Sequence, residues 1–96
     1  MPCCYIIFSE KLNRFYIGAT QDDPKNRIAK HNNHTYGKHK YTAKASDWKL
    51  FIAIEAEDYP HATRIERFIK KQKSAVYIRN LIKYPELVQK IKIRTQ

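Results

Sequence analysis

Two short stretches near the start of the chain constrain its fold more than any other feature. Residues 4–8 and 14–18 are rich in aromatic and β-branched side chains, and each contains one tyrosine, Tyr5 or Tyr16. Such runs are typical of β-strands. The mostly polar segment 9–14 between them favours a turn. We therefore expect a β-hairpin that places two phenol groups on neighbouring strands.

A helix and a long polar segment are expected after this hairpin. Acidic residues followed by Pro24 predict a helix start, and the helix should run to about Asn32 with Ile28 and Ala29 facing inward. Residues 33–47 are polar and basic, which predicts a loop that is long for a small domain.

The second half of the chain predicts a third strand and then helices. Residues 48–56 have a high apolar content, so this strand should be central in the sheet or covered on one face. Pro60 opens a second helix, and further helices are expected near 75–83 and 85–93. The apolar residues that we expect to face the core of these helices are Ala62, Ile65, Phe68, Ile69, Val76, Ile78, Leu81, Ile82, Leu87, Val88, Ile91 and Ile93.

The predicted fold is a single α+β domain that spans residues 1–96, with a core over about 3–82 and a helical tail over 83–96. The element order is β-β-α-β-α-α with a final helix, and the simplest packing is a small antiparallel sheet flanked by helices. A chain of 96 residues leaves no room for a second domain.

The two cysteines and the hydropathy pattern bear on location. Cys3 and Cys4 are adjacent, so a disulfide between them is strained and a zinc site is weak. We interpret them as reduced thiols in a cytoplasmic protein. No run of about 18 apolar residues occurs, so no membrane association is expected.

The charge of the chain favours a polyanionic partner. Nineteen Lys and Arg residues stand against nine Asp and Glu residues, a net charge of +10. Residues 60–96 contain ten of the basic side chains and only two acidic ones. Such an excess is most often found in proteins that bind nucleic acid.

Tyr5 and Tyr16 are the first candidates for chemistry on a phosphate ester. A phenol has an ordinary pKa near 10, so it needs nearby cations or a metal to act as a base. Gly18 would let the backbone leave the strand and let a substrate approach. Taken alone, however, two strand tyrosines are typical of sheet packing.

Arg27 and His31 are four residues apart and therefore share one face of the first predicted helix, opposite Ile28. The planar guanidinium suits a phosphate, and the histidine can carry a proton near neutral pH. An ordinary solvated helix face is the alternative. Lys30 is interpreted as a surface or phosphate contact.

Glu66 is the third candidate, because it is an isolated carboxylate in a basic segment. Mg²⁺ often uses one or two carboxylates together with substrate phosphate. The alternative is a salt bridge on the helix surface from Glu66 to Lys70.

The order and spacing of these residues resemble the GIY-YIG nuclease domain over roughly residues 3–82. The segments 40–42 and 66–71 are similar to its small stand-alone branch. The resemblance implies a three-stranded antiparallel sheet and metal-dependent hydrolysis of DNA with Mg²⁺ or Mn²⁺. The resemblance also implies which residues are catalytic. Tyr5 or Tyr16 would position or deprotonate the attacking water, and Arg27 would stabilise the phosphate. His31 would assist proton transfer or phosphate binding, and Glu66 would hold the metal.

The resemblance and the charge together also suggest a nucleic-acid-binding set. Its members are Lys30, Lys40, Tyr41, Lys44, Lys70, Lys71, Lys73 and Asn80.

Two positions depart from the family pattern. Cys3-Cys4 replaces the Gly-Ile that precedes the first tyrosine, and Ala19 stands where some branches carry a lysine that Lys40 or Lys44 would have to replace.

Three functional classes follow from the sequence. The first is a metal-dependent endonuclease that acts on DNA, with RNA left open. The second is a nucleic-acid-binding module without cleavage, in which Tyr36 and Tyr41 stack on bases. The third, a structural domain, does not account for the cation excess. A homodimer or a partner protein would supply target choice.

Overall fold

The computed structural model describes residues 1–37 and 41–96 and contains one three-stranded antiparallel sheet. The strands are β1 (Cys3–Ser9), β2 (Arg14–Thr20) and β3 (Lys49–Glu55), and they lie side by side in the order β2-β1-β3. This arrangement confirms the predicted α+β class and the predicted hairpin. In the hairpin register, Tyr5 lies opposite Gly18 and Ile7 lies opposite Tyr16.

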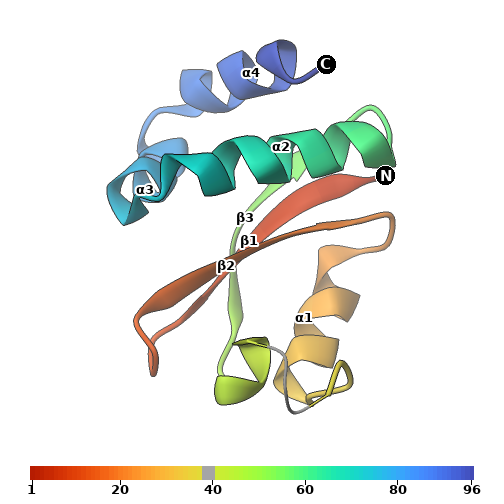
Figure 1. Ribbon diagram of the computed structural model, residues 1–96, viewed down its shortest axis with the longest axis vertical. Helices are drawn as coiled ribbons and strands as arrows, with labels where there is room; N and C mark the ends of the chain where they lie inside the picture. The colour runs from red at the N-terminus through yellow and green to blue at the C-terminus, as the bar shows by residue number, and fades with distance from the viewer. Residues whose placement is uncertain (38–40) are drawn as a thin grey trace.

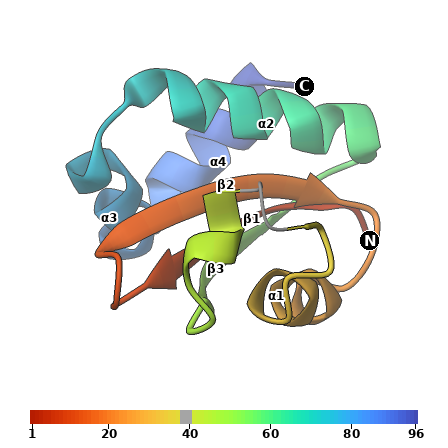
Figure 2. The same cartoon turned by 60° about the horizontal axis from the view of Figure 1, so that its bottom comes forward.

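The helices form two layers, one on each face of the sheet (Figures 1 and 2). One layer is α1, together with a short 3-10 turn η1, and the other is made of α2, α3 and α4. The bounds of these elements are α1 Pro24–Asn32, η1 Tyr41–Lys44, α2 Tyr59–Gln72, α3 Ala75–Lys83 and α4 Pro85–Arg94.

The helix starts follow from side-chain caps that the sequence carries. Asp23 accepts a hydrogen bond from the backbone N–H of Lys25, and Pro24 occupies the first turn. Asp58 and Ser74 cap α2 and α3 in the same way. Each cap satisfies an N–H group that has no partner inside the helix, so these residues fix where the helices begin. The predicted bounds 24–32 and 75–83 are confirmed.

The alternation of side chains along β1 creates two cores. Cys4 and Ile6 point to the face covered by α2, where Ile65 and Ile69 pack on them. Tyr5 and Ile7 point to the opposite face, where they meet Trp48 and the partly buried Ile28 of α1. Because successive residues of a strand face opposite sides, a single central strand supplies both cores.

Several details of the prediction were wrong. The third strand is not central but an edge strand, because β1 pairs with both neighbours. The alternative expectation, cover on one face, is met, because Ile54 is buried in the core under α2. Ala29 is exposed. Ile28 faces the same side of the sheet as the buried His31, and not the opposite side as expected, because both pack near Tyr5. The side chains of Val76, Ile82 and Ile93 are 67%, 52% and 68% exposed, because α3 and α4 each bury one narrow stripe.

The remaining comparisons with the prediction concern the loop and the cysteines. The segment predicted as a loop contains the short turn η1. Cys3 and Cys4 are both free and buried, as expected for strand packing. Among the described residues, none of the helices combines the length and apolar character needed to cross a bilayer.

Candidate active site

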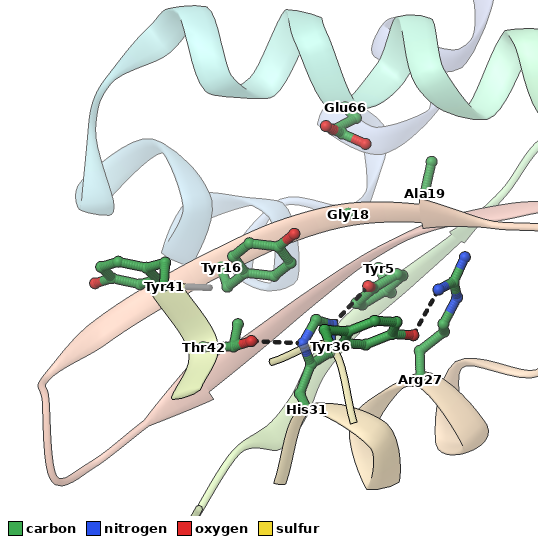
Figure 3. A pocket seen from close by; sticks show the side chains of 10 residues that line it. All are labelled: Tyr5, Tyr16, Gly18, Ala19, Arg27, His31, Tyr36, Tyr41, Thr42 and Glu66. Atoms are coloured by element: carbon green, nitrogen blue, oxygen red, sulfur yellow. Dashed lines mark hydrogen bonds between the residues drawn. The ribbon is translucent and has the colours of Figure 1, made fainter. Parts of the chain in front are cut away.

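A hollow of about 370 Å³ opens beside the edge strand β2 and collects the principal candidate residues. Figure 3 shows how the side chains that line it converge from β1, β2, α1, η1 and α2. The lining residues are Tyr5, Tyr16, Gly18, Ala19, Arg27, His31, Tyr36, Tyr41, Thr42 and Glu66.

A buried hydrogen-bonded chain lies at the bottom of this hollow. The Tyr5 hydroxyl bonds to Nε2 of His31 over 2.9 Å, and Nδ1 of His31 bonds to Oγ1 of Thr42 over 2.7 Å. All three side chains are almost fully buried. Burial and then the charge of Arg27 lower the pKa of His31 to about 4, so the imidazole is neutral at physiological pH. Burial also raises the pKa of Tyr5 well above its ordinary value.

Gly18 makes room for the Tyr5 phenol. A Cβ atom at position 18 would lie 2.6 Å from both Cζ and the hydroxyl oxygen of Tyr5. The strand does not end at Gly18 but continues to Thr20, so the predicted role of this glycine as a strand exit was wrong. The glycine instead lets a large ring lie flat across the neighbouring strand.

Arg27 is held by two hydroxyl groups. Its Nε donates to Oγ1 of Thr20 over 3.0 Å, and its Nη1 donates to the Tyr36 hydroxyl over 2.5 Å. The bond to Tyr36 is the main reason why the pKa of Arg27 is raised. A turn after α1, with left-handed backbone at His34 and Gly37, folds Tyr36 back over the helix.

Glu66 reaches the hollow from the opposite face of the sheet. In Figure 3 its carboxylate lies on the far side of β2 from Tyr5 and Arg27, near Ala19. The side chain is 21% exposed and forms a 2.6 Å salt bridge with Lys70, which is 50% exposed. The predicted helix-surface pair therefore forms, and the same carboxylate also lines the hollow.

Tyr16 and Tyr41 form the outer wall of the hollow. The Tyr16 ring packs edge-on against His31, with ring centres 5.0 Å apart, and its hydroxyl points towards the side of β2 on which Glu66 lies (Figure 3). Tyr41 is 39% exposed, and the Lys44 ammonium lies 5.2 Å from its ring centre. The ammonium of Lys44 thus lies beside Tyr41.

The predicted nucleic-acid-binding residues are mostly outside the hollow. Lys30 lines a neighbouring depression, and Asn80 lies on α3 without lining the hollow. Lys70 pairs with Glu66, while Lys71 and Lys73 are exposed at the end of α2. Lys40 lies outside the described residues.

Sequence reasoning missed the contacts that three residues make with the catalytic candidates, although Tyr36 was expected to stack on bases and Thr42 lies in a segment that resembles the family. Thr20 and Tyr36 bind Arg27, and Thr42 binds His31. Hydroxyl groups carry no periodic signal of their own. The available hint was the group of polar side chains in the segment that joins α1 to β3.

The residues present fit one kind of metal site. Within residues 1–37 and 41–96, no three His, Cys, Asp or Glu side chains gather in a way that could hold a metal ion. The described residues therefore offer no site built from three or more of these side chains. A Mg²⁺ or Mn²⁺ ion that takes most of its ligands from water and phosphate needs only one carboxylate, and Glu66 is the acidic residue among those described that line the hollow.

The comparison with known families agrees with this geometry. The family model of the GIY-YIG catalytic domain matches residues 1–80, and the chain therefore belongs to the GIY-YIG family. Searches of curated proteins and of solved structures gave no match. GIY-YIG domains are nuclease domains that act on DNA and generally depend on a divalent metal. Family membership thus supports phosphodiester hydrolysis as the reaction class.

Proposed function

We propose that this protein is an endonuclease that hydrolyses DNA phosphodiester bonds with Mg²⁺ or Mn²⁺. One observation carries the proposal: a guanidinium, a neutral histidine paired with a phenol, and a carboxylate line a single hollow. These groups come from opposite faces of the sheet, and packing alone gives no reason for their convergence.

Arg27 is the proposed phosphate-binding group. Hydrolysis adds negative charge to the oxygens of the phosphorus centre, and a fixed cation beside them stabilises that charge. The guanidinium is already held by Thr20 and Tyr36, so little reorganisation is needed when the phosphate arrives.

Tyr16, Tyr5 and His31 are the proposed groups for the attacking water. The Tyr16 hydroxyl positions the water, and the Tyr5 hydroxyl takes its proton while passing its own proton to Nε2 of His31. Tyr5 then never exists as a free phenolate, which burial disfavours. The water oxygen forms the new bond to phosphorus, and the ester oxygen leaves as the old bond breaks.

Glu66 is the proposed protein ligand for the metal. When bound, the metal supplies positive charge to the phosphate oxygens and to the leaving oxygen. Lys70 bonds to Oε2 only, so Oε1 can face the metal, and the 50% exposure of Lys70 also allows the ammonium to move into solvent.

The basic side chains of α2 are proposed to contact the DNA backbone. Lys70, Lys71 and Lys73 lie on the same helix as Glu66 or directly after it, and Lys30 lies beside Arg27 in the neighbouring depression. Contacts of this kind make binding weaken steeply as salt rises.

The buried, free cysteines agree with an intracellular location.

A binding module without cleavage is the second candidate. The observation that favours it is the Glu66–Lys70 salt bridge, which occupies the only acidic group of the hollow in the described part of the chain. The two candidates differ in turnover, since a binding module retains DNA without cutting it at any divalent ion concentration.

The test is cleavage of labelled linear, branched and single-stranded DNAs, with RNA as an added substrate, in Mg²⁺, Mn²⁺ or EDTA. We expect metal-dependent cleavage that falls about a thousandfold in Glu66→Gln. Glu86→Gln is the matched control, because it neutralises an exposed carboxylate on α4 that does not line the hollow, and it should remain active. Equal activity of Glu66→Gln and wild type would reject the proposed metal ligand, and binding without turnover in every condition would favour the module.

A further inference from the structure

Tyr36 takes no part in the proposed bond-making steps, but it contacts two of the groups that do. Its hydroxyl accepts a hydrogen bond from Nη1 of Arg27 over 2.5 Å. Its ring also packs against His31, with ring centres 4.8 Å apart, and lies 5.6 Å from the Arg27 guanidinium carbon. A single side chain therefore touches both the proposed phosphate-binding group and the proposed proton acceptor.

The N–H groups of Arg27 show how a phosphate can bind. A guanidinium has five N–H donors, one on Nε and two on each terminal nitrogen. Thr20 takes the Nε donor, and Tyr36 takes one donor of Nη1. A side-on approach to Nε and Nη2 is therefore blocked. Among the described residues, Nη2 keeps both of its donors and Nη1 keeps one, which is what an end-on approach needs.

We propose that Tyr36 and Thr20 are positioning residues that fix the Arg27 guanidinium so that the scissile phosphate binds end-on, through Nη1 and Nη2. The inference rests on the proposed function, because it names the geometry with which that site holds its substrate. It also defines a specific role for the turn between α1 and η1, which carries Tyr36 back over the helix.

The hydroxyl groups of Thr20 and Tyr36, which together we call the clamp on Arg27, are themselves held in place. Thr20 is fully buried, and its Oγ1 also accepts the backbone N–H of Asp22, so this hydroxyl cannot drift. Tyr36 is anchored through backbone bonds of its turn, from Thr35 to Lys30 and from Gly37 to His34. Fixing a planar donor group before substrate arrives lowers the entropy lost on binding and in the transition state.

The activity test is a double-mutant cycle with Tyr36→Phe, which keeps the ring on His31 and removes the hydroxyl. We expect kcat to fall about tenfold in the wild-type background, as for loss of a hydrogen bond to a charged group. In an Arg27→Ala background the same change should have no further effect. Thr20→Val should also lower kcat, and Thr20→Ser, which keeps the hydroxyl, should restore it. Equal losses from Tyr36→Phe in both backgrounds, or no loss in either, would overturn the inference.

A second readout does not depend on cleavage. Nitrogen-15 NMR of the Arg27 side chain follows the exchange of its N–H protons with water, which hydrogen bonding slows. We expect exchange to be about tenfold faster in Tyr36→Phe and in Thr20→Val, and unchanged in Tyr84→Phe, an exposed tyrosine beside α4. Unchanged exchange in both clamp variants would overturn the inference. Faster exchange in a protein that cleaves no substrate would support the clamp and reject only the proposed function.

Discussion

Two cores lie on opposite faces of the same three-stranded sheet, and they differ in what fills them. The core under α2, α3 and α4 is built from aliphatic side chains such as Ile6, Ile65 and Leu81. The core beside α1 is smaller, and buried hydroxyl and imidazole groups of Tyr5 and His31 lie within it or beside it. A buried polar group is costly unless it is hydrogen-bonded, and Tyr5 and His31 bond to each other. The second core therefore buries groups that are candidates for chemistry where the first buries aliphatic side chains.

Along β1, residues that point to one face of the sheet contribute mainly to stability, and residues that point to the other face contribute to the proposed activity. Tyr5 belongs to the polar core, while its neighbours Cys4 and Ile6 belong to the aliphatic one. Glu66 is the exception, because it stands on the aliphatic side and reaches the hollow past β2 near Ala19. Changes in either core should therefore have distinct signatures.

The largest effect on stability is expected for Ile65→Ala in the aliphatic core. Ile65 is fully buried, so its truncation should lower the free energy of unfolding by about 4 kcal/mol through lost contacts and a cavity. Urea denaturation measures this change. The cleavage rate per folded molecule should be unchanged, and Ile93→Ala, at a 68% exposed position, should change stability by no more than about 0.5 kcal/mol. A lower cleavage rate per folded molecule in Ile65→Ala would contradict the separation of stability from activity between the two cores.

Acid should weaken the polar core next. The pKa of His31 is about 4 in the folded protein and 6.5 ordinarily, so the unfolded chain binds more protons between these values. The His31 contribution is complete above pH 6.5 and is lost as the pH falls through about 4, which amounts to about 3 kcal/mol of unfolding free energy. Urea denaturation at pH 7 and pH 4 should show this loss in wild type, beyond any loss seen in His31→Gln. Identical pH dependence of the two proteins would contradict the burial argument.

A smaller loss of stability is expected from a change at Gly18, which lines the hollow on β2. Gly18→Ala would force a methyl group onto the Tyr5 ring and should destabilise the protein by about 2 kcal/mol while lowering activity. Val76→Ala is the control, because this side chain of α3 is 67% exposed and does not line the hollow. Thermal unfolding and cleavage assays should show that only Gly18→Ala disturbs activity. Normal activity in Gly18→Ala would show that Tyr5 can move freely.

The sequence predicted the aliphatic core better than the polar one. Inward positions such as Ile65 and Leu81 follow from periodic apolar residues, which act locally. A local signal also gave the start of α1 at Asp23 and Pro24, on the other face of the sheet. The exposure of Val76 and the edge position of β3 depend on which elements pair in three dimensions, and no local signal encodes that.

The polar site was only partly predictable for a related reason. Tyr5, Tyr16, Arg27, His31 and Glu66 follow a family spacing, and the structure brings them to one hollow. Thr20, Tyr36 and Thr42 enter through side-chain contacts with partners 7, 9 and 11 residues away, across turns, and Gly18 acts by the space it leaves. Such contacts are properties of the folded surface and leave little trace in spacing.

The most direct test of this separation compares two adjacent residues of β1, Tyr5→Phe and Ile6→Val. Each should lower the free energy of unfolding by about 1 kcal/mol, the first by losing a hydrogen bond and the second by losing a methylene. Measured on folded protein, DNA cleavage should fall about a hundredfold in Tyr5→Phe and stay at the wild-type rate in Ile6→Val. Equal cleavage rates in the two variants would contradict the account.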